Sequence, residues 1–162
     1  MGRGTAAGVL VSIAAIAVMA TLASSAPASN IGNEGCKASF WRNGSASWQE
    51  YRRGSKIGDN WTLPTSLAAY RQVTFLQALG YKRLKPAPPN TRLNRAARVL
   101  LRQAVAAYLN AAHEGVGYPY RRFRDPGRLA VRTNAALASL DARGMETLAT
   151  LLYRANKLGC PL

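Results

Sequence analysis

Histidine and acidic side chains are scarce in this sequence. His113 is the only histidine, and 7 aspartates and glutamates are spread over 162 residues. No two of these groups stand at a spacing typical of paired acid and base catalysts, and no cluster of ligand side chains surrounds either cysteine. The sequence therefore predicts no metal centre and no cofactor.

Cysteine is nearly absent as well. The 2 cysteines, Cys36 and Cys160, stand near opposite ends of the chain. Their separation excludes a C-x-x-C redox motif, in which one local turn stabilises the reactive thiolate. In an oxidising compartment we expect the pair to form a structural disulfide. In the chain-entropy model, closing a loop of that length stabilises a fold by about 4 to 5 kcal/mol.

Beyond residue 28 the sequence has no apolar run long enough to cross a bilayer. The first 28 residues carry a positive charge at Arg3, an apolar run over residues 6–23, and small side chains at Ala26 and Ala28. This order is typical of a secretory signal peptide. We therefore predict a signal peptide over residues 1–28, cleaved after Ala28, a polar lead over residues 29–35, and a secreted or cell-surface protein. The alternative is an uncleaved N-terminal membrane anchor, because 18 apolar residues reach the lower limit for a spanning helix.

Positive charge, in contrast, is abundant. The chain has 22 lysines and arginines against 7 acidic residues, a formal net charge of +15, and most of the cations are arginine. Such a surplus attracts polyanions over long distances. Outside the cell, the expected partners are anionic cell-wall polymer, acidic glycan or an anionic lipid surface, with nucleic acid ranked behind them. No small-molecule substrate is indicated.

The hydrophobic periodicity predicts a single all-α domain over residues 36–162, a compact array of four to five helices closed by the disulfide. No segment alternates at period two for long enough to suggest a sheet. The loops are expected at residues 54–64 and in the proline-rich connector 82–90. Helices are predicted from Ser45 or Ser47 to Arg52, from Thr65 or Ser66 to Leu79, over residues 91–113, from Asp125 to about Leu140, and over residues 143–158.

Two groups of arginines are the best candidates for a functional site. Four recur three or four residues apart in the predicted helix 91–113, which places them along one side of it. Guanidinium groups bind phosphate, sulfate and carboxylate through paired hydrogen bonds. The alternative is a solvated basic surface without a ligand. The polyanion-binding candidates are Arg92, Arg95, Arg98 and Arg102 on the helix, and Arg121, Arg122, Arg124 and Arg128 after it.

An aromatic cluster follows Cys36. Trp41 and Trp48, with Phe40 and Tyr51, are suited either to stacking on sugar rings or to packing in a core, and in a small domain we favour the core. Asn43 and Asn156 each stand close to a cysteine in sequence, where we expect them to satisfy backbone groups around the disulfide.

Three stretches resemble an uncharacterised family of secreted bacterial domains. They are Gly35-Cys36-x-x-x-Phe40-Trp41-Arg42-Asn43, the run from Ala104 to His113 with Tyr118-Pro119 after it, and Asn156-Lys157-Leu158-Gly159-Cys160-Pro161-Leu162. The resemblance implies export and surface display but no reaction. The family also has Thr-Pro-Gly where this chain has Lys37-Ala38-Ser39, and a histidine at Gly44, so a function that needed this histidine would be lost here.

Three functions follow in order of preference. The first is an exported, non-catalytic surface or cell-wall-associated module that binds polyanions through arginine. The second is a structural or protein-interaction domain whose charge is incidental. The third is a small hydrolase, for which Glu50 near Trp48, or His113 with Glu114, would supply the acid or base.

Overall fold

The structure is a computed structural model that describes residue 1 and residues 32–44, 48–80, 91–120 and 129–162. Residues 2–28 of the predicted signal peptide and the predicted connector at residues 82–90 lie outside the described residues, as do Arg121, Arg122, Arg124 and Arg128.

The described part of the chain is helical and contains no strand, which confirms the predicted all-α class. Two isolated antiparallel bridges, between Gly35 and Gly159 and between Lys56 and Thr74, are its nearest approach to a sheet. None of the described helices is both long and apolar enough to cross a membrane. The elements are α1 (Ala38–Asn43), α2 (Ile57–Asn60), a 3-10 helix η1 (Thr65–Tyr70), α3 (Phe75–Leu79), α4 (Arg92–Ala112), α5 (Leu129–Ala138) and α6 (Ala142–Ala155).

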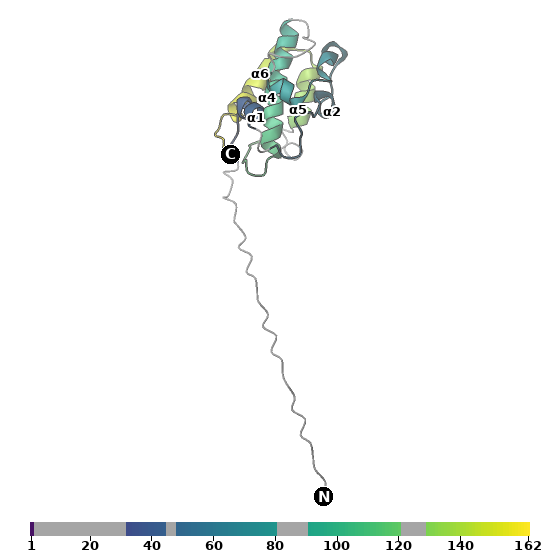
Figure 1. Ribbon diagram of the computed structural model, residues 1–162. Helices are drawn as coiled ribbons and strands as arrows, with labels where there is room; N and C mark the ends of the chain where they lie inside the picture. The colour runs from purple at the N-terminus through teal and green to yellow at the C-terminus, as the bar shows by residue number, and fades with distance from the viewer. Residues whose placement is uncertain (2–31, 45–47, 81–90, 121–128) are drawn as a thin grey trace.

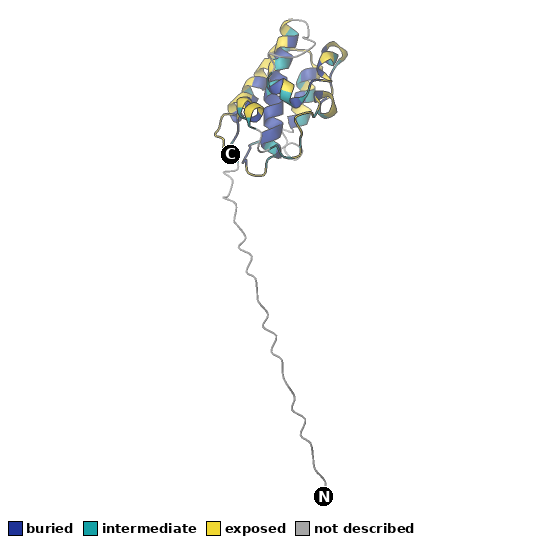
Figure 2. Cartoon of the chain, in the orientation of Figure 1, coloured by how far each residue is buried: buried dark blue, intermediate teal, exposed yellow. Residues whose placement is uncertain are grey.

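Helix α4 is the centre of the domain and runs through it in Figure 1. Thr91 caps its N-terminus by accepting a hydrogen bond from the Asn94 amide. Neither Gly nor Pro interrupts the helix, and α1, α3, α5 and α6 pack against it. Residues 103–110 are consequently buried on every side, as the dark blue part of α4 in Figure 2 shows. The predicted helix 91–113 is confirmed to within one residue at each end.

The prediction of one continuous helix from Thr65 or Ser66 to Leu79 was wrong. It is divided into η1 and α3, and residues 71–74 between them are not helical. Thr74 starts α3 with a capping box, accepting from the Gln77 amide and donating its own amide to the Gln77 side chain. The carbonyl of Val73 accepts from the Ile57 amide at 2.9 Å. These bonds draw the backbone away from a continuous helix.

The helix predicted from Ser45 or Ser47 to Arg52 was also wrong. Residues 48–52 are not helical, and Glu50 has a φ of 61°, in the left-handed region that interrupts a right-handed helix. Helix α1 lies earlier in the sequence, and the predicted loop 54–64 contains the short helix α2.

Helices α5 and α6 pack against each other and against α4. The predicted start of α5 at Asp125 lies outside the described residues, and α5 ends at Ala138. Leu140 then adopts a φ of 54°, and Asp141 caps α6 by accepting from the amides of Arg143 and Gly144. Helix α6 ends at Ala155, three residues before the predicted end.

The core is unusually aromatic on the side of α4 that faces α3. The rings of Trp61 and Tyr108 lie 4.5 Å apart, and Phe75 lies 5.6 Å from Trp61. Tyr51 packs against both Phe75 and Tyr108, at 5.3 Å and 5.8 Å. Tilted and stacked ring contacts of this kind stabilise a core beyond the area they bury.

Candidate functional site

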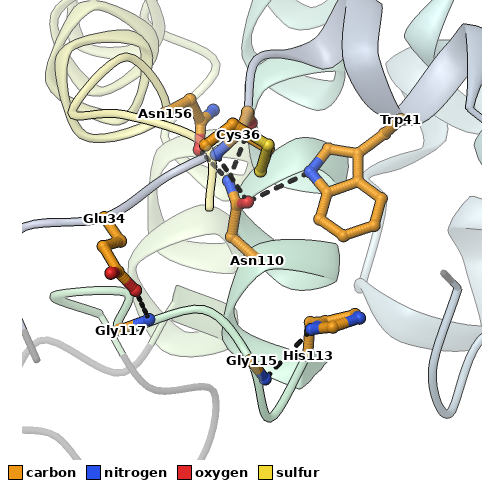
Figure 3. Close-up of a disulfide and its surroundings, with 9 residues drawn as sticks. Glu34, Cys36, Trp41, Asn110, His113, Gly115, Gly117 and Asn156 are labelled. Carbon is orange, nitrogen blue, oxygen red and sulfur yellow. Dashed lines mark hydrogen bonds between the residues drawn. A yellow bond between two sulfur atoms is a disulfide. The ribbon is translucent and has the colours of Figure 1, made fainter. Parts of the chain in front are cut away.

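The disulfide between Cys36 and Cys160 joins the two ends of the domain, as predicted. Cys36 lies beside the buried side chain of Asn110 on α4, which Figure 3 shows. The Asn110 Oδ1 atom accepts from the Cys36 amide at 2.8 Å and from Trp41 Nε1 at 3.1 Å. Its Nδ2 atom donates to the Cys36 carbonyl at 2.9 Å and to Asn156 Oδ1 at 3.0 Å.

Asn156 extends this buried network to the other helices. Its Oδ1 atom also accepts from the Tyr118 hydroxyl at 2.8 Å, and its Nδ2 atom donates to the Gln103 carbonyl at 3.1 Å. Burial, and to a smaller extent the neighbouring Tyr120, raises the pKa of Tyr118 well above its ordinary value, so its hydroxyl stays a donor. Because the network satisfies its own polar groups, we assign it a structural role.

The residues predicted to support the disulfide have different positions. Trp41 and Asn156 belong to the network, and Trp48 donates from its Nε1 atom to the Trp41 carbonyl at 3.1 Å. Asn43 is exposed at the end of α1 and lies outside the network. The sequence did not single out Asn110, although this residue lies in the run from Ala104 to His113 that resembles the bacterial family. Its hydrogen bonds to Cys36 and Asn156 form only when α4 packs against the segments that contain them.

The backbone before Cys36 is also tied to the domain. Gly35 donates to the Gly159 carbonyl at 2.7 Å, and Glu34 accepts from the Gly117 amide at 2.6 Å. A Cβ atom on Gly35 would stand 2.2 Å from the Ala155 carbonyl oxygen, so only glycine fits there. Residues 32–35, expected in the polar lead, are therefore hydrogen bonded to the folded domain.

The aromatic cluster does not form an open stacking surface. Trp41 is 1% exposed, and Phe40, Trp48 and Tyr51 are partly buried against the core. Because a sugar ring stacks on the free face of an aromatic side chain, the burial of Trp41 favours the core interpretation.

The segments that contain the catalytic candidates are hydrogen bonded to each other at the C-terminal end of α4. The Gln49 side chain accepts from the Glu114 amide at 2.8 Å, which brings the segment containing Glu50 to this end. The Nδ1 atom of His113 accepts from the Gly115 amide at 3.1 Å (Figure 3). In the neutral ring, the Nε2 atom therefore carries the proton, and His113 offers a donor rather than a general base.

Burial lowers the pKa of His113, while the charge of Glu114 acts in the opposite direction. Within the described residues, no three side chains of His, Cys, Asp or Glu gather as they would to hold a metal ion.

The four predicted arginines of α4 line the N-terminal half of the helix, where it is not covered on every side. Arg92 and Arg95 are exposed, and Arg92 forms an ion pair with Glu146 of α6 at 3.5 Å. Arg98 and Arg102 are half-buried, and their Nε atoms are fully enclosed. We call these four residues the α4 arginine face.

Arg98 also lies close to buried Tyr70. Burial raises the pKa of the Tyr70 hydroxyl to about 12, and the positive charge of Arg98 opposes that rise. The hydroxyl donates to the Asn94 carbonyl at 2.9 Å, which fixes Tyr70 against α4. Arg98 of the α4 arginine face therefore lies next to a buried, hydrogen-bonded side chain of the core.

Sequence reasoning missed a second basic surface, between α5 and α6. Arg132 of α5 and Arg143 and Arg154 of α6 line a groove of about 920 Å³ there. The signal was present in the sequence, since Arg143 and Arg154 are 11 residues apart, which is close to three helical turns.

No family model, curated protein or solved structure matches this chain. The resemblance to secreted bacterial domains stays a prediction, and the function is argued from the geometry of the chain itself.

Proposed function

We propose that this protein is an exported, non-catalytic surface or cell-wall-associated module that binds polyanions through the α4 arginine face. One observation carries the proposal: four guanidinium groups lie along the part of the central helix that the other elements leave accessible. Anionic cell-wall polymer is the first candidate ligand, followed by acidic glycan and anionic lipid surfaces, with nucleic acid behind them.

The spacing of the arginines suits a polymer better than a single anion. Arg92 and Arg102 are ten residues apart, so their positions on the helix differ by about 15 Å along its axis. One phosphate or carboxylate cannot contact both ends of such a row, whereas successive anionic groups of a polymer can. Because several cations then act together, the bound polymer releases several counterions and the affinity depends steeply on salt.

Two of the four arginines of the α4 arginine face, Arg98 and Arg102, are partly buried. The enclosed Nε atoms of Arg98 and Arg102 restrict the side chains before any ligand arrives. Less side-chain entropy is then lost on binding, which favours affinity. The ion pair of Arg92 with Glu146 lies between exposed side chains and is weak, so a polyanion can displace it.

The proposal that the protein is exported rests on the sequence pattern of the first 28 residues. The disulfide is consistent with export, since such bonds persist in oxidising compartments. The cleaved protein and the membrane-anchored alternative would present the same domain outside the cell. A hydrolase remains the third candidate, and the protonation expected for neutral His113 weighs against a general base at that position.

The test is binding of the oxidised, exported protein to immobilised anionic wall polymer, acidic glycan, phosphatidylglycerol vesicles and nucleic acid across a salt series. One variant changes Arg92, Arg95, Arg98 and Arg102 to Gln. A matched control changes four exposed cations elsewhere, Lys37, Arg42, Arg52 and Lys56, to Gln, which removes the same charge.

We expect tight binding to one polymer, lost in the α4 variant and largely retained in the control. Equal losses in both variants would mean that net charge alone drives binding, and the proposal would fail. Undiminished binding by the α4 variant would contradict it as well.

A further inference from the structure

The groove between α5 and α6 combines an apolar floor with a basic rim. Its floor includes side chains of both helices, and Leu148 and Leu151 are mostly enclosed while still lining it. Its three cations are all exposed arginines. The residues that matter here are Arg132 and Ala135 of α5, and Arg143, Leu148, Leu151 and Arg154 of α6.

The groove is separate from the α4 arginine face. Along α6, Arg143, Leu151 and Arg154 follow one another at spacings of eight and three residues, which places them on one side of the helix. Glu146, which pairs with Arg92 of α4, does not line the groove. None of the four arginines of the α4 arginine face lines it either.

The other polar groups of the groove are already engaged. Asp141 accepts from two backbone amides at the start of α6. Thr147 and Thr150 donate their hydroxyls to the carbonyls of Arg143 and Glu146, both at 2.9 Å. Of the charged side chains in the groove, three are arginines and one is Asp141, so the groove favours an anionic ligand.

We propose that this groove binds an acidic amphipathic helix of a partner protein. The apolar side of such a helix would cover Leu148, Leu151 and Ala135, and carboxylates along its edges would pair with the three arginines. Recognition of a helix in an apolar groove through residues spaced three and four apart is a common mode of peptide binding.

The distribution of charge favours a helix over a single lipid molecule. Arg143 and Arg154 are separated by about 16 Å along the axis of α6, so one headgroup cannot reach both. A helix carries several carboxylates over that length. The partner must be another protein, because this chain has 7 acidic residues in all and a net charge of +15, so a second copy would be repelled.

The probe is a synthetic 18-residue helical peptide with leucines along one side and glutamates flanking them. Its affinity for the oxidised, exported protein is measured by fluorescence anisotropy. One control peptide replaces glutamate by lysine, and a second keeps the glutamates and replaces leucine by serine, which tests the apolar floor without altering the protein.

The protein variants separate this groove from net charge. Changing Arg132, Arg143 and Arg154 to Gln should weaken peptide binding about tenfold, since three exposed charge pairs are lost and each contributes modestly. Changing Lys37, Arg42 and Arg52 to Gln, three exposed cations outside both arginine surfaces, removes the same charge, and we expect less than a twofold effect. Thermal unfolding of both variants verifies that they are folded.

Equal binding of the acidic peptide and of its serine control would overturn the proposal, and so would equal losses of affinity in the two protein variants. The proposal would also fail if phosphatidylglycerol vesicles bound more tightly than the peptide and their binding needed the groove arginines. Failure of the peptide to bind while the α4 arginine face still binds polyanions would refute this inference and leave the proposed function intact.

Discussion

At the scale of single residues, Asn110 connects the disulfide to the helices. Its carboxamide offers two donor hydrogens and an oxygen that accepts two bonds, and Cys36, Trp41 and Asn156 use all of them. No other side chain of similar size has this combination. The two ends of the domain therefore depend on one amide near the C-terminal end of α4.

Replacing Asn110 should be costly. In Asn110→Asp both donor hydrogens are lost and a carboxylate is buried, so we expect the free energy of unfolding to fall by about 3 kcal/mol or more. Urea unfolding of the oxidised protein measures the change. Asn43→Ala is the control, since an exposed position should change stability by about 0.5 kcal/mol at most. An Asn110→Asp variant as stable as the wild type would refute the structural role of the network.

His113 should make stability depend on pH. Because burial lowers its pKa in the folded protein, the unfolded chain binds a proton below about pH 6.5 that the folded protein does not bind. Stability should then fall as the pH drops from 7.5 through 6.5, and the contribution should level off below the folded pKa.

His113→Gln should remove this step between pH 7.5 and 5.5. Since the chain has one histidine, an NMR titration of its ring protons gives the folded pKa without ambiguity. A folded pKa at or above 6.5 would contradict the direction assigned here.

Residues of the network show what a sequence can predict at this scale. Asn156 stands four residues before Cys160, so its closeness to the disulfide could be inferred. Asn110 and Tyr118 reach the same place only through the packing of α4 against α6, a contact that no local spacing reveals. Asn43, equally close to a cysteine, is exposed because it lies on the outer side of α1.

At the scale of elements, caps determine where the shorter helices begin. Asp141 accepts from two amides of the first turn of α6, and its negative charge also favours that end of the helix. Leu140, with its φ of 54°, makes the abrupt turn from α5 that places Asp141 there.

Asp141→Ala should lower the free energy of unfolding by about 1 kcal/mol, because two amides lose their acceptor. Asp141→Asn, which keeps a capping oxygen, should retain most of the stability. Denaturant unfolding of both variants tests this, and equal losses in the two would show that the cap is not the cause.

The long helices could be predicted, and the short ones could not. Helix α4 has 21 residues without Gly or Pro, enough to show a helical hydrophobic period, and Thr91 caps its N-terminus. Helices α1, α2 and α3 have 6, 4 and 5 residues, too few to show a period. Their positions depend on tertiary bonds, such as the bond between Ile57 and Val73, which join segments distant in sequence.

At the scale of the whole molecule, the disulfide closes a loop of 124 residues around a single core. Cys36 is buried whereas Cys160 is exposed. The bond and the network of Asn110 hold the same two ends of the chain together.

Removing the bond with Cys36→Ala and Cys160→Ala should lower the free energy of unfolding by about 4 to 5 kcal/mol, chiefly by freeing the unfolded chain. Urea unfolding of the double variant and of the reduced wild type should agree. A loss below about 1 kcal/mol would show that the hydrogen bonds alone hold the ends together.

The arginine surfaces differ in how far the sequence predicts them. The α4 arginine face follows from a period of three and four residues within one helix. The groove of Arg132, Arg143 and Arg154 requires the relative placement of two helices and so emerges from the structure. The net charge predicts an attraction to anions, but the fold determines which cations lie close enough to act together.

The central claim is that the α4 arginine face, rather than charge in general, binds the polymer. The most direct measurement is the slope of log affinity against log salt for the preferred polymer, compared between wild type, the four-arginine α4 variant and the matched variant at Lys37, Arg42, Arg52 and Lys56. We predict that the α4 variant loses about one unit of slope for each arginine that contacts the polymer, and that the matched variant keeps nearly the wild-type slope. Identical slopes in the two variants would contradict the claim.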